Sequence, residues 1–211
     1  MINLIINADD FGLSDRFNAS ILDLLERGQI TSTTVMVNRI SDSQTGSLER
    51  LKKLQNTVDI SVGLHVEFTY DQHLEQVQRQ FEKFVHLFGQ KPTHLDIHKE
   101  HLHTAYHEIV AAFCKEQQIP FRNHGSNYPD VKMPHSKFFF GSIADFKPIE
   151  EWFAGLESER YYELVFHPGV YDPTCPSSLN KEREKDLEHI AHIYQNLKQY
   201  NIQLTNFKNL P

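Results

Sequence analysis

The chain has 211 residues, thirteen histidines, two cysteines and a formal net charge of −7, which favours one domain over residues 1–211 and argues against a nucleic-acid partner. The cysteines, Cys114 and Cys175, form no CxxC pair, which excludes a thiolate zinc site and fits a reducing cytoplasm. The first apolar run is too short for a signal peptide or a membrane span, so we expect a cytoplasmic protein without a membrane partner.

Strands and helices are predicted to alternate along the chain. Residues 2–6 are continuously apolar, as in a strand buried on both faces, and Ser14 is placed to cap a helix over 17–25 that ends at Gly28. Further strands are predicted at 31–38, 59–68, 93–98, 120–122, 161–169 and 202–207. Further helices are predicted at 43–54, 74–88, 104–117, 149–156 and 187–197.

This alternation predicts six or seven βα units in an α/β domain. No strand is followed by GxGxxG or GxxxxGK[ST], so a closed or nearly closed (β/α) barrel is favoured over an open nucleotide-binding sheet. Residues 124–135, with Gly125, Pro129 and Pro134, are predicted to form a long loop at the active site.

Carboxylates and imidazoles follow several of the predicted strands. They are Asp9 and Asp10 after the first strand, His65 and Glu67 on the third, Asp96 and His98 on the fourth, and His167 on a late one. The carboxyl ends of barrel strands meet at one mouth, where active sites lie. These side chains therefore predict a divalent-metal site with an open coordination position.

Each motif also has a structural interpretation. Adjacent aspartates are common in turns and helix caps, and a single histidine at a strand end is more often structural than a ligand. Asp96 and His98 could belong to a hydrogen-bonded ladder on one strand face, and "HKEHLH" at 98–103 could be a solvated helix start. Their joint position at strand ends favours a functional site.

Several motifs in succession resemble those of the YdjC-like carbohydrate deacetylases, the family of chitooligosaccharide deacetylase. They are "NADDFGLS" at 7–14, "ERGQITSTTVMVN" at 26–38, "GLHVEFT" at 63–69, "PTHLDIHKEHLH" at 92–103 and "ELVFHPGVYD" at 163–172. "REKDL" at 183–187 and "IQLTNFKNL" at 202–210 resemble the last helix and strand of that family. The resemblance implies a deformed (β/α) barrel of the polysaccharide-deacetylase type, which binds one divalent cation and removes N-acetyl groups from amino sugars or oligosaccharides.

Carried over residue by residue, the resemblance makes Asp10, His65 and His98 the metal ligands. It makes Asp9 the general base and His167 the general acid. Such ligands suit zinc, and also manganese, cobalt or a loosely held magnesium.

Asp96 would then orient one of the imidazole ligands, by accepting a hydrogen bond from the ring nitrogen that does not bind the metal.

The chain departs from the family pattern at two places. The long insertion that follows the "GLH" strand is missing, because a helix begins soon after Thr69; a homodimer could supply the missing wall. The "DIHKEHLH" motif has an extra residue, which leaves His101 and His103 as competitors of His98, and Glu67 replaces a usually neutral residue. Two alternatives therefore stay open: a metallohydrolase for another amide, ester or phosphoester, and a catalytically silent barrel that binds a sugar or metal.

Overall fold

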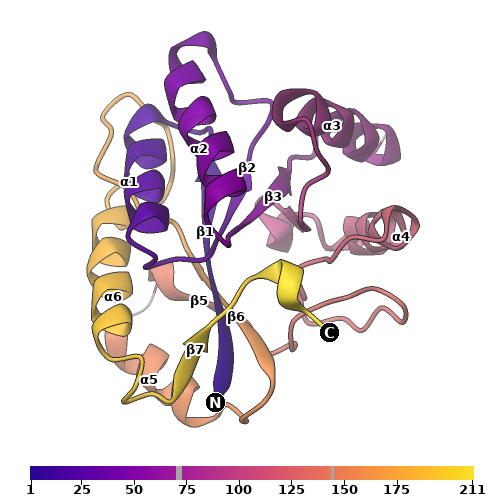
Figure 1. Cartoon of the computed structure of the whole chain (residues 1–211). Coiled ribbons are helices and arrows are strands. Elements are labelled where there is room, and N and C mark those ends of the chain that lie inside the picture. The colour runs from indigo at the N-terminus through magenta and orange to yellow at the C-terminus, as the bar shows by residue number, and fades with distance from the viewer. Residues whose placement is uncertain (70–72, 144) are drawn as a thin grey trace.

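A computed structural model describes residues 1–69, 73–143 and 145–211, and forms an α/β half-barrel (Figure 1). Within these residues, seven parallel strands form one sheet in the order β4-β3-β2-β1-β6-β5, and β7 pairs with β1 beside this path. The strands are β1 (Ile2–Phe11), β2 (Ser32–Val35), β3 (Ser61–Val66), β4 (Leu95–Ile97), β5 (Phe139–Phe140), β6 (Tyr161–Phe166) and β7 (Ile202–Leu204). The predicted α/β barrel of deformed shape is confirmed.

Strand β1 is the centre of the sheet. One of its edges pairs with β6 from Asn3 to Ala8. The other edge is divided, because β7 pairs with its beginning at 2–4 and β2 with its end from Asn7 to Phe11. Because these strands are parallel, the carboxyl ends of β1, β2, β3 and β6 lie at the same edge of the sheet.

The helices lie outside the curved sheet, as Figure 1 shows. They are α1 (Asp15–Glu26), α2 (Thr45–Thr57), α3 (His73–Phe88), α4 (His107–Gln117), α5 (Phe146–Ala154) and α6 (Arg183–Gln195). Short 3-10 helices are η1 (Asp42–Gln44), η2 (Glu100–Leu102), η3 (Thr104–Tyr106), η4 (Gly141–Ile143) and η5 (Phe207–Asn209). None of the helices in the described residues is long and apolar enough to cross a membrane.

Local sequence explains the bounds of α1. The hydroxyl of Ser14 accepts a hydrogen bond from the backbone N–H of Arg16, as a cap does, and Gly28 follows the helix with φ +65°. The buried residues Phe17, Ile21 and Leu25 form the apolar stripe that packs on the sheet. The predicted cap, stripe and stop are therefore confirmed.

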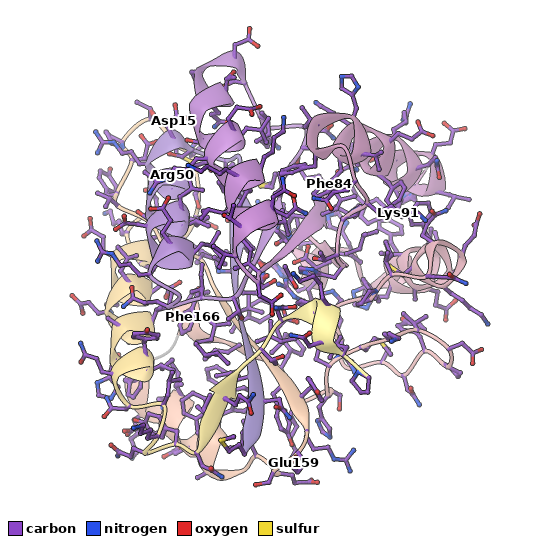
Figure 2. All side chains as sticks on the ribbon, in the orientation of Figure 1. Asp15, Arg50, Phe84, Lys91, Glu159 and Phe166 are labelled. Atoms are coloured by element: carbon purple, nitrogen blue, oxygen red, sulfur yellow. The ribbon has the colours of Figure 1, made fainter. Side chains whose placement is uncertain are left out.

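Most buried apolar side chains belong to one continuous core between the sheet and its helices. Figure 2 marks Phe166 in the interior of the molecule, where its side chain is fully buried. Glu159 lies at the edge of the molecule near the start of the chain, where it pairs with the terminal amine of Met1 at 2.7 Å. The core thus holds the strands in the positions that build the site.

Several predicted bounds differ from the observed ones. The last helix begins at Arg183 rather than at 187, and the strands predicted at 31–38, 59–68, 161–169 and 202–207 are shorter. The first strand runs through both aspartates to Phe11, and residues 120–122 make only a single bridge, between Phe121 and Leu95. Helix α5 begins at Phe146 rather than at 149, because Pro148 is tolerated in a first turn, where no intrahelical donor is lost. The short connection predicted after Thr69 falls partly on residues 70–72, which lie outside the described residues.

Candidate active site

Both aspartates of the first motif face the same cavity at the end of β1. Successive strand residues normally point to opposite faces, but Asp10 has φ +69° and the register with β2 shifts between Ala8 and Phe11. The left-handed conformation is tolerated by aspartate better than by most residues. This bulge brings the carboxylates of Asp9 and Asp10 together in the wall of one pocket.

Asp10, His65 and His98 form a cluster that can hold a cation. One atom from each of them lies within 4.8 Å of the others. Asp10 Oδ1 lies 3.5 Å from His65 Nε2 and 3.3 Å from His98 Nδ1, and these two nitrogens are 3.0 Å apart. Among the described residues, Asp10 Oδ1 is buried without a hydrogen-bond partner. A buried, unpartnered carboxylate oxygen that faces two imidazole nitrogens fits a divalent metal.

The two competing histidines lie elsewhere. His101 is exposed at the rim of the cavity, and His103 packs its ring against Phe68 and Tyr106, with centroids 5.7 and 5.6 Å away. Neither belongs to a cluster of possible ligands within the described part of the chain. The geometry therefore favours His98 over both.

Asp96 orients the His65 ring. Its Oδ1 lies 2.6 Å from His65 Nδ1, which leaves Nε2 directed at Asp10. Burial opposes a charge on His65, but Asp96 and Asp9 outweigh it and hold the pKa of His65 well above its ordinary range. The field of these carboxylates therefore favours a positive charge at this position, whether a proton or a metal ion.

Arg122 fixes the Asp9 carboxylate. Its Nη1 and Nη2 donate to the two oxygens of Asp9 at 2.9 and 2.7 Å, and its Nε donates to Glu163 at 2.8 Å. It also pairs with Asp96 at 2.7 Å, and its own side chain is 1% exposed. Burial alone would raise the pKa of Asp9, but Arg122 and the neighbouring imidazoles hold it well below its ordinary range. Asp9 is thus a charged carboxylate in a fixed orientation.

Arg183 fixes the second aspartate. Its Nη2 donates to Asp10 Oδ2 at 2.5 Å and to Ser177, while its guanidinium lies 4.0 Å over the Phe17 ring. Burial raises the pKa of Asp10, but the imidazoles of the cluster and Arg183 outweigh it, so the net pKa lies well below the ordinary value. Because Oδ2 is taken by the guanidinium, Oδ1 is the oxygen left for a cation.

His167 also lies close to Asp9. Its Nε2 lies 3.8 Å from Asp9 Oδ2, and its Nδ1 lies 2.7 Å from the Ser142 hydroxyl, which donates to Asp186 at 2.6 Å. The His167 backbone N–H also donates to Asp186, at 2.7 Å. Burial lowers the pKa of His167, with Arg183 acting in the same direction and Asp10, Asp9 and Asp186 against it. The hydrogen-bond chain directs Nε2 into the cavity.

The cavity has a volume of about 560 Å³ and includes Asp9, Asp10, His65, His98 and His167 in its lining. Its remaining walls come from Leu13, Met36, Arg39, Ile97, the residues from Lys99 to Leu102, Phe140, Ser142, and the residues from Pro176 to Leu179. The volume is typical of pockets for small ligands.

The loop predicted at 124–135 is not one of the segments that line this cavity. It contacts the segment before it instead: the backbone N–H of Phe121 donates to the carbonyl of Lys132, and the Asn123 side chain donates to the carbonyl of Pro134. Residues 124–135 therefore form a long loop as predicted, but residues 176–179 line the cavity in its place.

Sequence reasoning missed four side chains of the site: Arg122, Arg183, Ser142 and Asp186. An arginine at the end of the apolar segment "IPFRN" was the available signal for Arg122, because a charge there needs a buried partner. Ser142 and Asp186 carried no local signal, since their role depends on contact with His167. Glu67, which departs from the family pattern, pairs with Arg39 at 2.8 Å rather than with the cluster.

The fold and this cluster define a class: parallel α/β half-barrels with carboxylates and imidazoles at the carboxyl ends of their strands. The YdjC-like protein family model matches residues 3–79 and 72–201, and the chain belongs to this family. The two matched segments meet at 72–79, close to the place where the sequence predicts a missing insertion. The predicted family is confirmed.

Relatives and solved structures agree with this assignment. The carbohydrate deacetylase of Clostridium beijerinckii is 29% identical over 254 residues, which cover 99% of this chain and 100% of the relative. A structure from Enterococcus faecalis, proposed to be a cellobiose-phosphate cleavage protein, matches with a TM-score of 0.76 and 20% identity over 98% of this chain and 97% of its own. The Bc1960 peptidoglycan N-acetylglucosamine deacetylase matches with a TM-score of 0.63 and 12% identity over 99% and 87%. These structures show the polysaccharide-deacetylase type of fold.

Proposed function

We propose that this chain, over residues 1–211, is a metal-dependent carbohydrate deacetylase that hydrolyses the N-acetyl group of an amino sugar or oligosaccharide. The observation that carries the proposal is the arrangement of Asp9 beside the cluster of Asp10, His65 and His98, with His167 Nε2 3.8 Å from the Asp9 carboxylate. Membership of the YdjC-like family, and the relative named carbohydrate deacetylase, support the choice of substrate.

Asp10, His65 and His98 would hold the ion. Two imidazoles and one carboxylate suit Zn²⁺ and other transition metals, and Mg²⁺ would bind only with several waters. A bound divalent ion supplies a Lewis acid that polarises the amide carbonyl and stabilises the negative charge that develops on its oxygen. We propose Zn²⁺ as the first ion to test and Mg²⁺ as the second.

Asp9 would act as the general base. Its carboxylate lies 3.9 Å from His65 Nε2, so it is next to the cluster without being one of its ligands. There it would accept a proton from the water whose oxygen forms a bond to the acetyl carbon. Arg122 holds both of its oxygens, so the carboxylate keeps its charge and orientation before the reaction begins.

His167 would act as the general acid. When the bond between the acetyl carbon and the nitrogen breaks, the nitrogen needs a proton, because an amide anion is a very poor leaving group. His167 Nε2 would donate this proton, and the products are acetate and a free amine. Ser142 contacts Nδ1 of the ring and donates a hydrogen bond to Asp186, so Nε2 is the nitrogen that faces the cavity.

The experiment measures the release of acetate and of inorganic phosphate from a panel of three substrates. Metal-loaded protein is offered N-acetylglucosamine oligomers, an O-acetylated sugar and a sugar phosphate, and EDTA-treated protein serves as the control. We expect acetate from the N-acetylated oligomers, loss of the activity with EDTA, and recovery on addition of Zn²⁺. Turnover of the sugar phosphate alone would contradict the proposal and favour the second candidate, a phosphoesterase on a similar site.

The second candidate has one specific observation in its favour, the Enterococcus faecalis structure proposed to cleave a cellobiose phosphate. A catalytically silent barrel is less well supported, because Asp9 and His167 have the contacts of a base and an acid that a binding protein does not need.

We also propose a cytoplasmic location and a homodimer. Both cysteines are free, which suits a reducing compartment. Leu102 lines the cavity while 65% of it is exposed, so a second copy could cover this wall. Light scattering of the purified protein tests the dimer, and a monomeric mass at micromolar concentration would contradict it.

A further inference from the structure

A second group of possible metal ligands lies apart from the catalytic cluster. It consists of Glu100 on η2, His107 at the start of α4, and His124 two residues beyond Arg122. One atom from each lies within 4.8 Å of the others. None of the three has a role in the proposed hydrolysis.

The distances suit a four-coordinate ion. Glu100 Oε2 lies 3.5 Å from His107 Nε2 and 3.9 Å from His124 Nδ1. Donor atoms about 2.0 Å from a tetrahedral zinc are roughly 3.3 Å apart, so a small contraction of the group would complete the geometry. The rings of His107 and His124 are stacked with centroids 4.8 Å apart, and one nitrogen of each lies within 3.9 Å of Glu100 Oε2.

The hydrogen bonding of these histidines is incomplete. The His124 side chain is 0% exposed, yet neither of its ring nitrogens has a hydrogen-bond partner in the described part of the chain. His107 Nε2 is likewise buried and unpartnered there. Buried polar groups are normally paired, so the two unpartnered nitrogens nearest Glu100, His107 Nε2 and His124 Nδ1, call for an additional partner.

The surroundings of the His124 imidazole are partly aromatic. Phe121 and Phe138 lie near the His124 ring, with centroids 5.3 and 6.1 Å away. Burial, with Arg122 adding to it, holds the pKa of His124 well below its ordinary value. The positive charge of Arg122 does not prevent cation binding, because its guanidinium is already paired with buried carboxylates.

We propose that Glu100, His107 and His124 form a second cation site, separate from the catalytic one, which binds Zn²⁺ or a similar transition-metal ion. Two nitrogens and one carboxylate oxygen exclude a calcium-type cage of oxygens and leave a fourth position for water. The Glu100 side chain is 19% exposed and lines the active-site cavity, so an ion can enter from that side. The bound ion ties η2, the start of α4 and the segment after Phe121 together, and so fixes one wall of the cavity.

The test counts zinc ions per chain. Full-length wild type, Glu100→Ala, His124→Gln and the control His86→Gln, which removes an exposed histidine of α3, are stripped with EDTA, loaded with Zn²⁺ and gel-filtered. We expect two equivalents in the wild type and the control, and one in each of the other two variants. A zinc content in either variant equal to that of the control would overturn the proposal, as would a wild type that retains one equivalent or less.

A second measurement covers the case in which His124→Gln does not fold. Asp10→Asn, which removes a ligand of the catalytic cluster, is loaded with Co²⁺ and its visible spectrum is recorded. We expect the absorption of four-coordinate Co²⁺, and its loss when Glu100→Ala is added. Absence of this absorption in Asp10→Asn would overturn the proposal. Acetate release is not part of either readout, so failure of the deacetylase assignment and failure of the second site are distinguishable.

Discussion

Replacing Arg122 by methionine tests the strongest electrostatic feature of the site. Its guanidinium pairs with Asp9 and Asp96 at 2.7 Å and with Glu163 at 2.8 Å, and none of these side chains is more than 3% exposed. Methionine has a similar length and no charge, so the substitution removes the guanidinium that three buried carboxylates share.

The magnitude follows from these distances. At an effective dielectric constant of about 20, two unit charges 2.7 Å apart attract each other by roughly 6 kcal/mol, before the cost of their desolvation. Removal of one partner from a buried ion pair typically costs about 3–5 kcal/mol. Since three carboxylates share one guanidinium, we expect a loss of about 4 kcal/mol in the free energy of unfolding, a large part of the total of about 5–15 kcal/mol.

Urea unfolding at neutral pH, followed by circular dichroism, measures this loss. The control is Arg50→Met, because Arg50 pairs with Glu26 on the surface, where the two side chains are 41% and 38% exposed. We expect a cost of about 0–1 kcal/mol for the control. Equal losses in the two variants would refute the argument that Arg122 neutralises the buried carboxylates.

Three further predictions concern other parts of the fold. Burial raises the pKa of Glu163 from its ordinary value of 4.5 to about 7, so its contribution to stability is present below pH 4.5 and is lost as the pH rises through 7. The difference in unfolding free energy between wild type and Glu163→Gln should fall over this window by up to about 3 kcal/mol, and a difference independent of pH would be inconsistent with the shift. Ser142→Ala should lower kcat about a hundredfold with little change in KM or metal content, because His167 loses its orientation, whereas a change confined to KM would argue against this role. Gly63→Ala should cost about 1–3 kcal/mol in thermal unfolding, since its Cβ would lie 2.5 Å from a buried imidazole, while Gly46→Ala in α2, with nothing within 4 Å, should be neutral or stabilising.

The sequence was most informative where local pattern decides the structure. The apolar stripe of α1, the cap at Ser14 and the stop at Gly28 depend on neighbouring residues, and all three predictions are confirmed. Except for Glu67, the predicted side chains at strand ends do converge, because parallel strands place their carboxyl ends at one edge.

What the sequence could not predict depends on contacts between distant segments. Arg122 is 113 residues from Asp9 along the chain, and Asp186 reaches His167 through the hydroxyl of Ser142. The loop at 124–135 has the composition of an active-site loop, but its backbone bonds to the segment at Phe121 keep it away from the mouth. The bulge at Asp10 could not be predicted either, because no local sequence pattern marks an aspartate with a left-handed backbone conformation.

The central claim is that one aspartate of the adjacent pair holds the metal and the other activates water. The most direct measurement determines metal content and acetate release together, for Asp9→Asn and Asp10→Asn, with N-acetylglucosamine oligomers as substrate. The account predicts that Asp9→Asn binds as much metal as the wild type and releases no acetate, whereas Asp10→Asn loses one metal equivalent. Acetate release by Asp9→Asn at the wild-type rate, or an unchanged metal content in Asp10→Asn, would contradict it.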